Sequence, residues 1–259
     1  MPSQGPRFDD LKIHLVVLGR EHEVGARVRV GACRPIDVVP LARRVTDVIT
    51  DAAVRAAEAE GRAVSCRVGC ASCCRHVVPV APIEALALAK AVKAMPAKQR
   101  EAVRRRFGAA VRKMEEIGVL DAHAPPGRTQ LTAIPARGKS AWDTASARYF
   151  AASIDCPFLE NERCSIYADR PVACRQHLAT SPPEHCKDLE GGKVETTARP
   201  VWMSEVLADL SASIADVDAK AMPLPLALEW AEAQGAALDV EVQGEDLARE
   251  LLERTTAAE

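Results

Sequence analysis

The sequence predicts a mainly α protein, a helical scaffold with two loop-rich cysteine segments and a short N-terminal β-hairpin. Aromatic residues make up only 3% of the chain and alanine is frequent, which favours helices over a β-sandwich. Apolar residues recur at helical spacing in several long segments, and they alternate with polar residues near the N-terminus. These patterns predict helices around one early hairpin.

Alternation predicts the two strands of that hairpin over residues 11–15 and 26–30, with a turn within residues 19–23. Three parts of the chain are expected. They are an N-terminal β-hairpin segment (1–36), a cysteine-cluster metal-binding domain (37–190) and C-terminal helices that pack on the same core (191–259).

Helical periodicity defines the rest of the scaffold. A helix is expected over residues 39–60, and Pro82 and Pro96 each open another. Ser140 and Asp143 resemble a capping box for a helix that ends near residue 152, after a predicted loop over 123–139. Further amphipathic helices are expected over 202–216, 225–234 and 245–254. The many basic residues of the helix after Pro96 are interpreted as a solvated face, in preference to an anion or partner site.

Charge and targeting patterns exclude several classes of protein. Lys+Arg 34 against Asp+Glu 36 is too balanced for a general nucleic-acid or acidic-membrane surface. Residues 1–10 show no signal peptide, and no apolar run approaches the ~20 residues that cross a bilayer. We therefore expect a cytoplasmic protein with no nucleic-acid or membrane partner. In that compartment nine cysteines indicate metal binding in preference to disulfides.

Eight of the nine cysteines fall into two groups, and we predict that these eight are metal ligands. The first group is Cys66, Cys70, Cys73 and Cys74, and the second is Cys156, Cys164, Cys174 and Cys186. Soft thiolates select zinc, iron–sulfur clusters or Cu(I). Four thiolates close a zinc site or hold one 4Fe–4S cluster, so eight allow two sites, or one site with spare thiols. The adjacent pair Cys73 and Cys74 fits a polynuclear centre or two nearby sites, because the side chains of neighbouring residues point in different directions.

Several residues near these cysteines are candidates for supporting roles. Four arginines are placed to donate charge-assisted hydrogen bonds to sulfur as cofactor-binding residues, although each also fits a solvated surface role. They are Arg67, Arg75, Arg170 and Arg175. Cys33 stands alone and is expected to be a core thiol. His76 and His177 are within reach of the cysteines but are expected to be structural.

The motif order resembles a known family. Cys-x3-Cys-x2-Cys-Cys is followed by Cys156-Pro-Phe-Leu, Cys164-Ser-Ile-Tyr, Arg170-Pro171 and Cys174-Arg175. This pattern is similar to the YkgJ-type cysteine-cluster family, described as zinc- or iron-chelating proteins, over about residues 61–186. By position the resemblance implies ligand roles for the cysteines through Cys174, and also for Cys186. A related pattern in bacterial flagellin lysine methylases is associated with an iron–sulfur centre, which favours iron–sulfur over zinc.

Three functions remain open from the sequence. The first is an iron–sulfur protein (4Fe–4S, or an iron ion) for redox or sensing work, with a protein redox partner. The second is a zinc-binding structural or metal-transfer module. The third is an iron–sulfur-dependent methyl-transfer enzyme. Cys66, Cys70 and Cys73 match the spacing of radical S-adenosylmethionine enzymes. However, Ser72 stands where that motif carries an aromatic residue, and the barrel pattern is missing.

Overall fold

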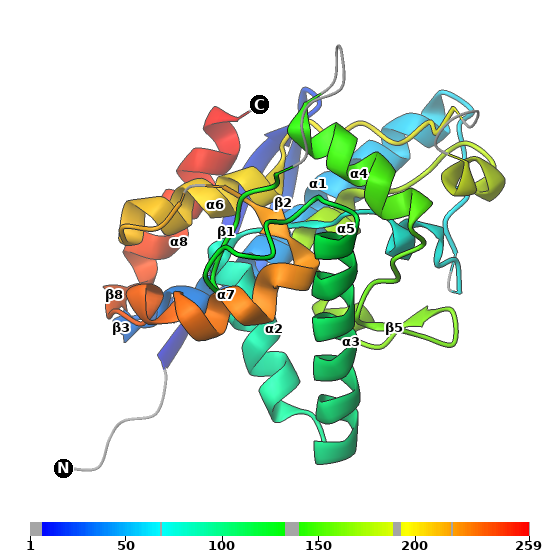
Figure 1. The fold of residues 1–259 in the computed structure, drawn as a ribbon. Coiled ribbons are helices and arrows are strands. Elements are labelled where there is room, and N and C mark those ends of the chain that lie inside the picture. Colours follow the sequence, from blue (N-terminus) through cyan, green and yellow to red (C-terminus); the bar gives the residue numbers. More distant parts are fainter. Residues whose placement is uncertain (1–6, 68, 133–139, 189–192, 219, 259) are drawn as a thin grey trace.

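A computed structural model describes residues 7–67, 69–132, 140–188, 193–218 and 220–258 (Figure 1). The predicted fold class is confirmed, because 53% of the described residues are helical and these residues form eight α-helices, an N-terminal hairpin and small two-stranded sheets. Residues 1–6, residues 133–139 of the predicted loop and the predicted boundary between residues 190 and 191 lie outside the described residues.

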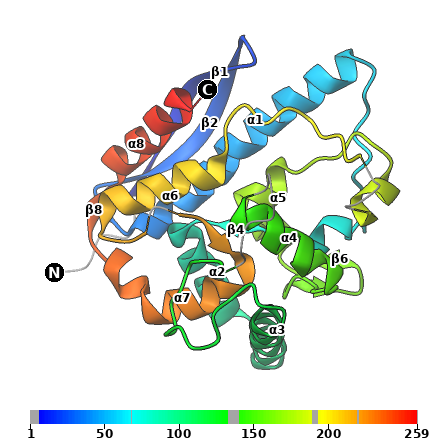
Figure 2. The ribbon, with the colours of Figure 1, turned by 45° about the horizontal axis from the view of Figure 1, so that its top comes forward.

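The N-terminal hairpin joins β1 (Arg7–Val17) to β2 (Arg20–Val30) in antiparallel register, with Ile13 opposite Val24. Leu18 and Gly19 form its two-residue turn, with φ of 52° and 71°, as the twist of a tight hairpin requires. The hairpin packs on α1 (Val39–Ala59) and α8 (Gly244–Ala257), beside which it lies in Figure 2. Alternate residues of the strands are buried there, which explains the alternation in the sequence.

One hydrophobic core extends from the hairpin to α8. α2 (Pro82–Ala94) packs against α6 (Met203–Ile214) and α7 (Ala227–Ala233), and α6 packs against α8. Leu88 and Leu207 are among its fully buried side chains. The C-terminal helices therefore share a core with the central ones.

Two further helices complete the scaffold. α3 (Ala97–Glu116) buries one face, including Phe107 and Met114. α4 (Ala141–Ala151) begins at the predicted capping box, in which Ser140 Oγ accepts a hydrogen bond from the Asp143 backbone N–H. Within the described residues, no helix is both long enough and apolar enough to cross a membrane.

Several short elements join segments that are distant in the chain, and the sequence did not predict them. α5 (Val172–Gln176) packs on α1. The antiparallel strand pairs are β3 (Ala32–Cys33) with β8 (Val242–Gln243), β4 (Pro79–Val80) with β7 (Met222–Pro223), and β5 (Leu159–Glu160) with β6 (Arg163–Cys164). Cys33, on β3, is buried in the core.

Candidate metal centre

The two cysteine groups meet at the end of the molecule that carries α4 and β6, away from the hairpin and α8 (Figure 2). All eight thiols are free, and seven of them are half-buried. They lie on short elements and loops, as the tight spacing of the motifs predicted.

The first cysteine group, Cys66 to Cys74, contains a turn that leads into the 3₁₀ helix η2 (Ser72–Arg75). Gly69 has a φ of +87°, a left-handed conformation that glycine adopts without strain, and the Cys70 N–H closes the turn on the Arg67 carbonyl at 2.9 Å. Upstream, Cys66 Sγ accepts a hydrogen bond of 3.2 Å from the Ala179 backbone N–H. This bond orients the first thiol of the motif.

A backbone hydrogen bond joins the two groups directly. The N–H of Cys156 donates to the carbonyl of Cys74 at 2.7 Å. From Cys156 the chain continues into the β5–β6 hairpin, in which Leu159 lies opposite Cys164. The hairpin therefore returns Cys164 to the neighbourhood of Cys156.

Cys174 lies on α5, which ionic contacts to α1 hold in place. Arg175 forms an ion pair with Asp47 at 2.9 Å, and Arg43 pairs with Asp169 at 2.6 Å just before α5. Both arginine side chains are largely buried, at 11% and 15% exposed. Such pairs position the segment that carries Cys174.

Cys186 approaches from a third segment, the 3₁₀ helix η4 (Pro183–Lys187), which packs against η2. His76 Nε2 lies 2.9 Å from the Cys186 carbonyl oxygen, and the His76 ring lies against Phe150 with centroids 5.0 Å apart. His76 thus contacts the backbone of a candidate ligand. Burial lowers the pKa of His177 to about 4, with contributions from Arg199 and His76.

Burial and neighbouring cysteines raise the pKa values of several of these thiols. Burial raises the pKa of the Cys174 thiol well above its ordinary value, and the charges of Cys156, Cys73 and Cys164 raise it further. Burial likewise raises the pKa of Cys156 to about 12, again with contributions from Cys164 and Cys73. The pKa of Cys73 is raised first by its hydrogen bond to Cys74 and then by burial. Without a cation these thiols favour the neutral form.

Arg170 supplies a positive charge at this place. Its Nε is buried and has no hydrogen-bond partner among the described residues, and its guanidinium lies over the Tyr167 ring at 4.1 Å. Its charge acts to lower the pKa of Cys66, Cys73 and Cys164. An unpartnered buried N–H close to several thiols fits a negatively charged thiolate centre.

The other arginines named from the sequence have different surroundings. Arg75 forms ion pairs with Asp155 at 3.0 Å and Glu162 at 2.6 Å. Arg175 binds Asp47, as described above. Arg67 is exposed and lines a pocket. Within the described residues, none of the four donates a hydrogen bond to a cysteine sulfur.

The donor set fits a metal that prefers sulfur, although its side chains are not yet arranged around an ion. Among the described residues, no three His, Cys, Asp or Glu side chains already converge on one point that would hold a metal. Binding therefore requires thiol side chains to turn toward one another and to lose their protons. The crowding of eight thiols and the unpartnered Arg170 Nε are the observations that indicate this use.

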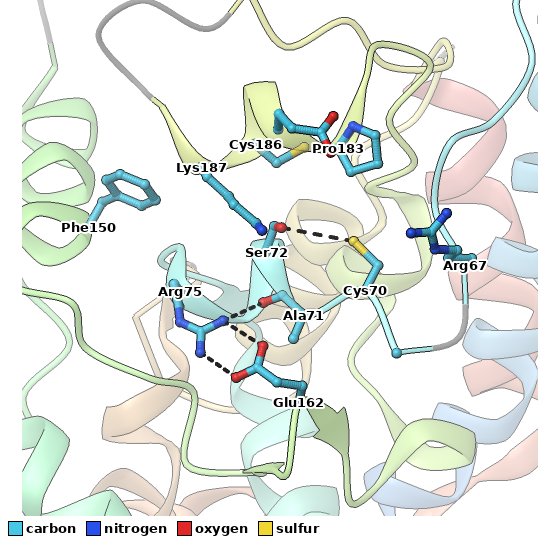
Figure 3. A pocket seen from close by; sticks show the side chains of 12 residues that line it. Arg67, Cys70, Ala71, Ser72, Arg75, Phe150, Glu162, Pro183, Cys186 and Lys187 are labelled. Carbon is cyan, nitrogen blue, oxygen red and sulfur yellow. Dashed lines mark hydrogen bonds and ion pairs between the residues drawn. The ribbon is translucent and has the colours of Figure 1, made fainter.

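A pocket of about 510 Å³ opens beside the cysteines (Figure 3). Cys70, Ser72 and Cys186 lie on its wall, and the Cys70 and Ser72 side chains approach at 3.9 Å. Lys187 extends across it toward Ser72. No sequence motif predicts this pocket, because residues 67–75 and 183–187, which are more than a hundred residues apart in the chain, both contribute to its walls.

A family model described as "CxxCxxCC: Putative zinc- or iron-chelating domain" matches residues 65–198, just over half of the chain. All eight clustered cysteines fall inside the matched range. No curated protein and no solved structure matches the chain significantly.

Proposed function

The chain belongs to the CxxCxxCC family of zinc- or iron-chelating domains, and we propose that its clustered thiolates hold an iron–sulfur cluster used in redox or sensing work. Arg170 carries this proposal. Its buried, unpartnered Nε lies where thiols from both halves of the motif gather. A thiolate-held cluster is negatively charged, and hydrogen bonds to its sulfurs tune its reduction potential.

Four thiols supply the number that a 4Fe–4S cluster needs. They are Cys73, Cys156, Cys164 and Cys174, and their charges influence one another's protonation. When bound, the cluster would supply one-electron chemistry. The chain would orient the four sulfurs from three segments and offset their negative charge with Arg170. The electrons would be exchanged with a protein redox partner.

A zinc protein is the second candidate, and a specific observation favours it. Cys70 and Cys186 form a grouping on the wall of the pocket, which Cys156, Cys164 and Cys174 do not line. Two neighbouring mononuclear zinc ions would use both groupings, whereas a single cluster would leave this one spare. The zinc would then act as a structural ion or be transferred to another protein.

The deciding experiment is to purify the full chain without oxygen and to measure iron, acid-labile sulfide and zinc per chain. Iron and sulfide at about four each, with broad absorption near ~400 nm, would support the iron–sulfur proposal. Zinc with no sulfide would overturn it in favour of the second candidate. As a matched pair, Cys174→Ser is expected to lose the cluster and Cys33→Ser to keep it, because Cys33 is buried apart in the core.

A further inference from the structure

We propose that the outer edge of β1 pairs antiparallel with β1 of a second copy of this chain, across a twofold axis at Leu11. The two hairpins would then form one continuous sheet. In such a symmetric interface the same strand serves both partners. This inference goes beyond the proposed function and does not depend on metal binding.

β1 is a long strand with one unpaired edge. It spans Arg7–Val17, and among the described residues its only strand partner is β2, in a two-stranded sheet. Hydrogen-bonded pairs alternate along an antiparallel ladder, starting with the pair of Val17 and Arg20 that closes the two-residue turn. The N–H and C=O groups of the even-numbered residues of β1 therefore point away from β2. A long unpaired edge is a template for pairing with another strand.

Leu11 is exposed although the residues that follow it on the same face of the strand are buried. Ile13, Leu15 and Val17 are at most 9% exposed, whereas Leu11 is 42% exposed. On the opposite face Phe8 is 44% exposed. A second strand at the edge of β1 would cover part of both apolar side chains, which removes their surface from water.

A register centred on Leu11 matches the charges along the edge. It places Asp10 opposite Lys12 of the second copy and, by symmetry, Lys12 opposite the other Asp10. It also places Phe8 opposite His14, and the two copies of Leu11 meet at the axis. Opposite charges that face each other across two strands stabilise a sheet, whereas like charges destabilise it.

The neighbouring registers lack this match. An axis at Asp10 would bring the two copies of Asp10 together, and an axis at Lys12 would do the same to the two lysines. An axis at Ile13 would place Lys12 opposite His14. Of these registers, the one centred on Leu11 pairs Asp10 with Lys12 and brings no like charges together.

The charged side chains of the edge are accessible to a second copy. Lys12 pairs with Glu23 of β2 at 3.1 Å, and Arg27 of β2 pairs with Asp10 at 3.6 Å. Even so, the side chains of Lys12 and Asp10 are 75% and 86% exposed. Pairing of the two strands would join an ion pair of each hairpin into one row of alternating charge.

Sedimentation equilibrium of the reduced, metal-free full chain tests the pairing. One added strand pairing makes a small interface, so we expect a monomer–dimer equilibrium with a Kd of about 10–100 μM. Lys12→Asp and Asp10→Lys should each raise this Kd by about 10-fold or more, because like charges then meet on both sides of the axis. Lys98→Asp replaces an exposed cation of α3 and should leave the Kd unchanged. An unaltered chain that stays monomeric up to about 1 mM would overturn the proposal.

A mixture of the two variants separates the register from a general loss of folding. Lys12→Asp carries carboxylates at both positions and Asp10→Lys carries cations at both, so every facing pair in a mixed dimer has opposite charges. The mixture should therefore associate with a Kd within about 3-fold of that of the unaltered chain, although neither variant associates as well alone. A mixture that associates no better than its components, or a Lys12→Asp chain that dimerises like the unaltered one, would overturn the register centred on Leu11.

Discussion

The Glu84 carboxylate, in the first turn of α2, accepts a hydrogen bond of 2.9 Å from the backbone N–H of Val172 at the start of α5. It also accepts a 3.5 Å hydrogen bond from the Ala81 N–H. Glu84 is 2% exposed, and burial raises its pKa while the two N–H groups act to lower it. This side chain therefore connects α2, in the central core, to α5, the short helix that carries Cys174.

We predict that Glu84→Gln destabilises the protein by about 1–3 kcal/mol, because the amide cannot accept from both N–H groups through two oxygens. It should also weaken metal retention, since α5 loses an anchor. Urea unfolding and metal content after dialysis measure both effects. Glu101→Gln on the exposed face of α3 is the matched control. Unchanged stability would indicate that the native carboxyl is already protonated and needs no charge.

The hairpin and the longer helices could be predicted because each repeats one period over many residues. The alternation in β1 corresponds to the buried side chains of Ile13, Leu15 and Val17, although Leu11 is exposed. Ser140 marks the start of α4, because its side chain accepts a hydrogen bond from the Asp143 backbone N–H. Strands of two residues, such as Ala32–Cys33, are too short to show a period. The anchor at Glu84 depends on tertiary packing, and its sequence signal was limited to an acidic residue in a first helical turn.

The sequence indicates which residues are candidate ligands but not how they are arranged. Cysteine spacing predicts the candidates, because short intervals restrict how far the thiols can separate. It could not show that Cys73 adjoins the second group, or that Cys186 reaches the pocket with Cys70. Those relationships depend on the Cys156–Cys74 backbone bond and on η4 packing against η2.

Arg75 links η2 to the segment around Cys156 through its ion pairs with Asp155 and Glu162. We predict that Arg75→Met weakens metal binding about 10-fold, since the two cysteine segments lose a clamp. Stability should fall by less than ~1 kcal/mol, because these charges are substantially solvated. Competition titration with Zn²⁺ measures the affinity. Arg163→Met removes an exposed arginine that forms no ion pair with the part of the chain that the structure describes, and this variant should bind metal as the unaltered chain does. Equal loss of affinity in both variants would refute the role of Arg75.

We predict that the free energy of unfolding depends on pH through His177. Burial lowers its pKa from 6.5 to about 4, so the native state holds it neutral while the unfolded chain takes up a proton. Its contribution to the free energy of unfolding is therefore fully present above pH 6.5 and is lost as the pH falls toward 4. Burial raises the pKa of Cys156 and Cys174, so these thiols do not titrate in this range.

Urea unfolding of the metal-free chain between pH 6.5 and 4 tests this dependence. The stability of the unaltered protein should fall more steeply with decreasing pH than that of His177→Gln. His14→Gln replaces an exposed histidine and should retain the full slope. Identical slopes for all three proteins would contradict a neutral native His177.

Arg128 forms a partly buried ion cluster with carboxylates of α3 and α7. It is 10% exposed and pairs with Glu115 of α3 at 2.5 Å and with Glu229 of α7 at 3.3 Å. We predict that Arg128→Met costs about 2–4 kcal/mol, because two carboxylates lose the cation that compensates their burial. Arg104→Met is the control and should cost less than ~1 kcal/mol, since the pair of Arg104 with Glu232 is exposed. Urea unfolding measures both costs, and zinc stoichiometry should stay unchanged in each variant. A similar small cost in both variants would show that the Arg128 pairs are as well solvated as a surface contact.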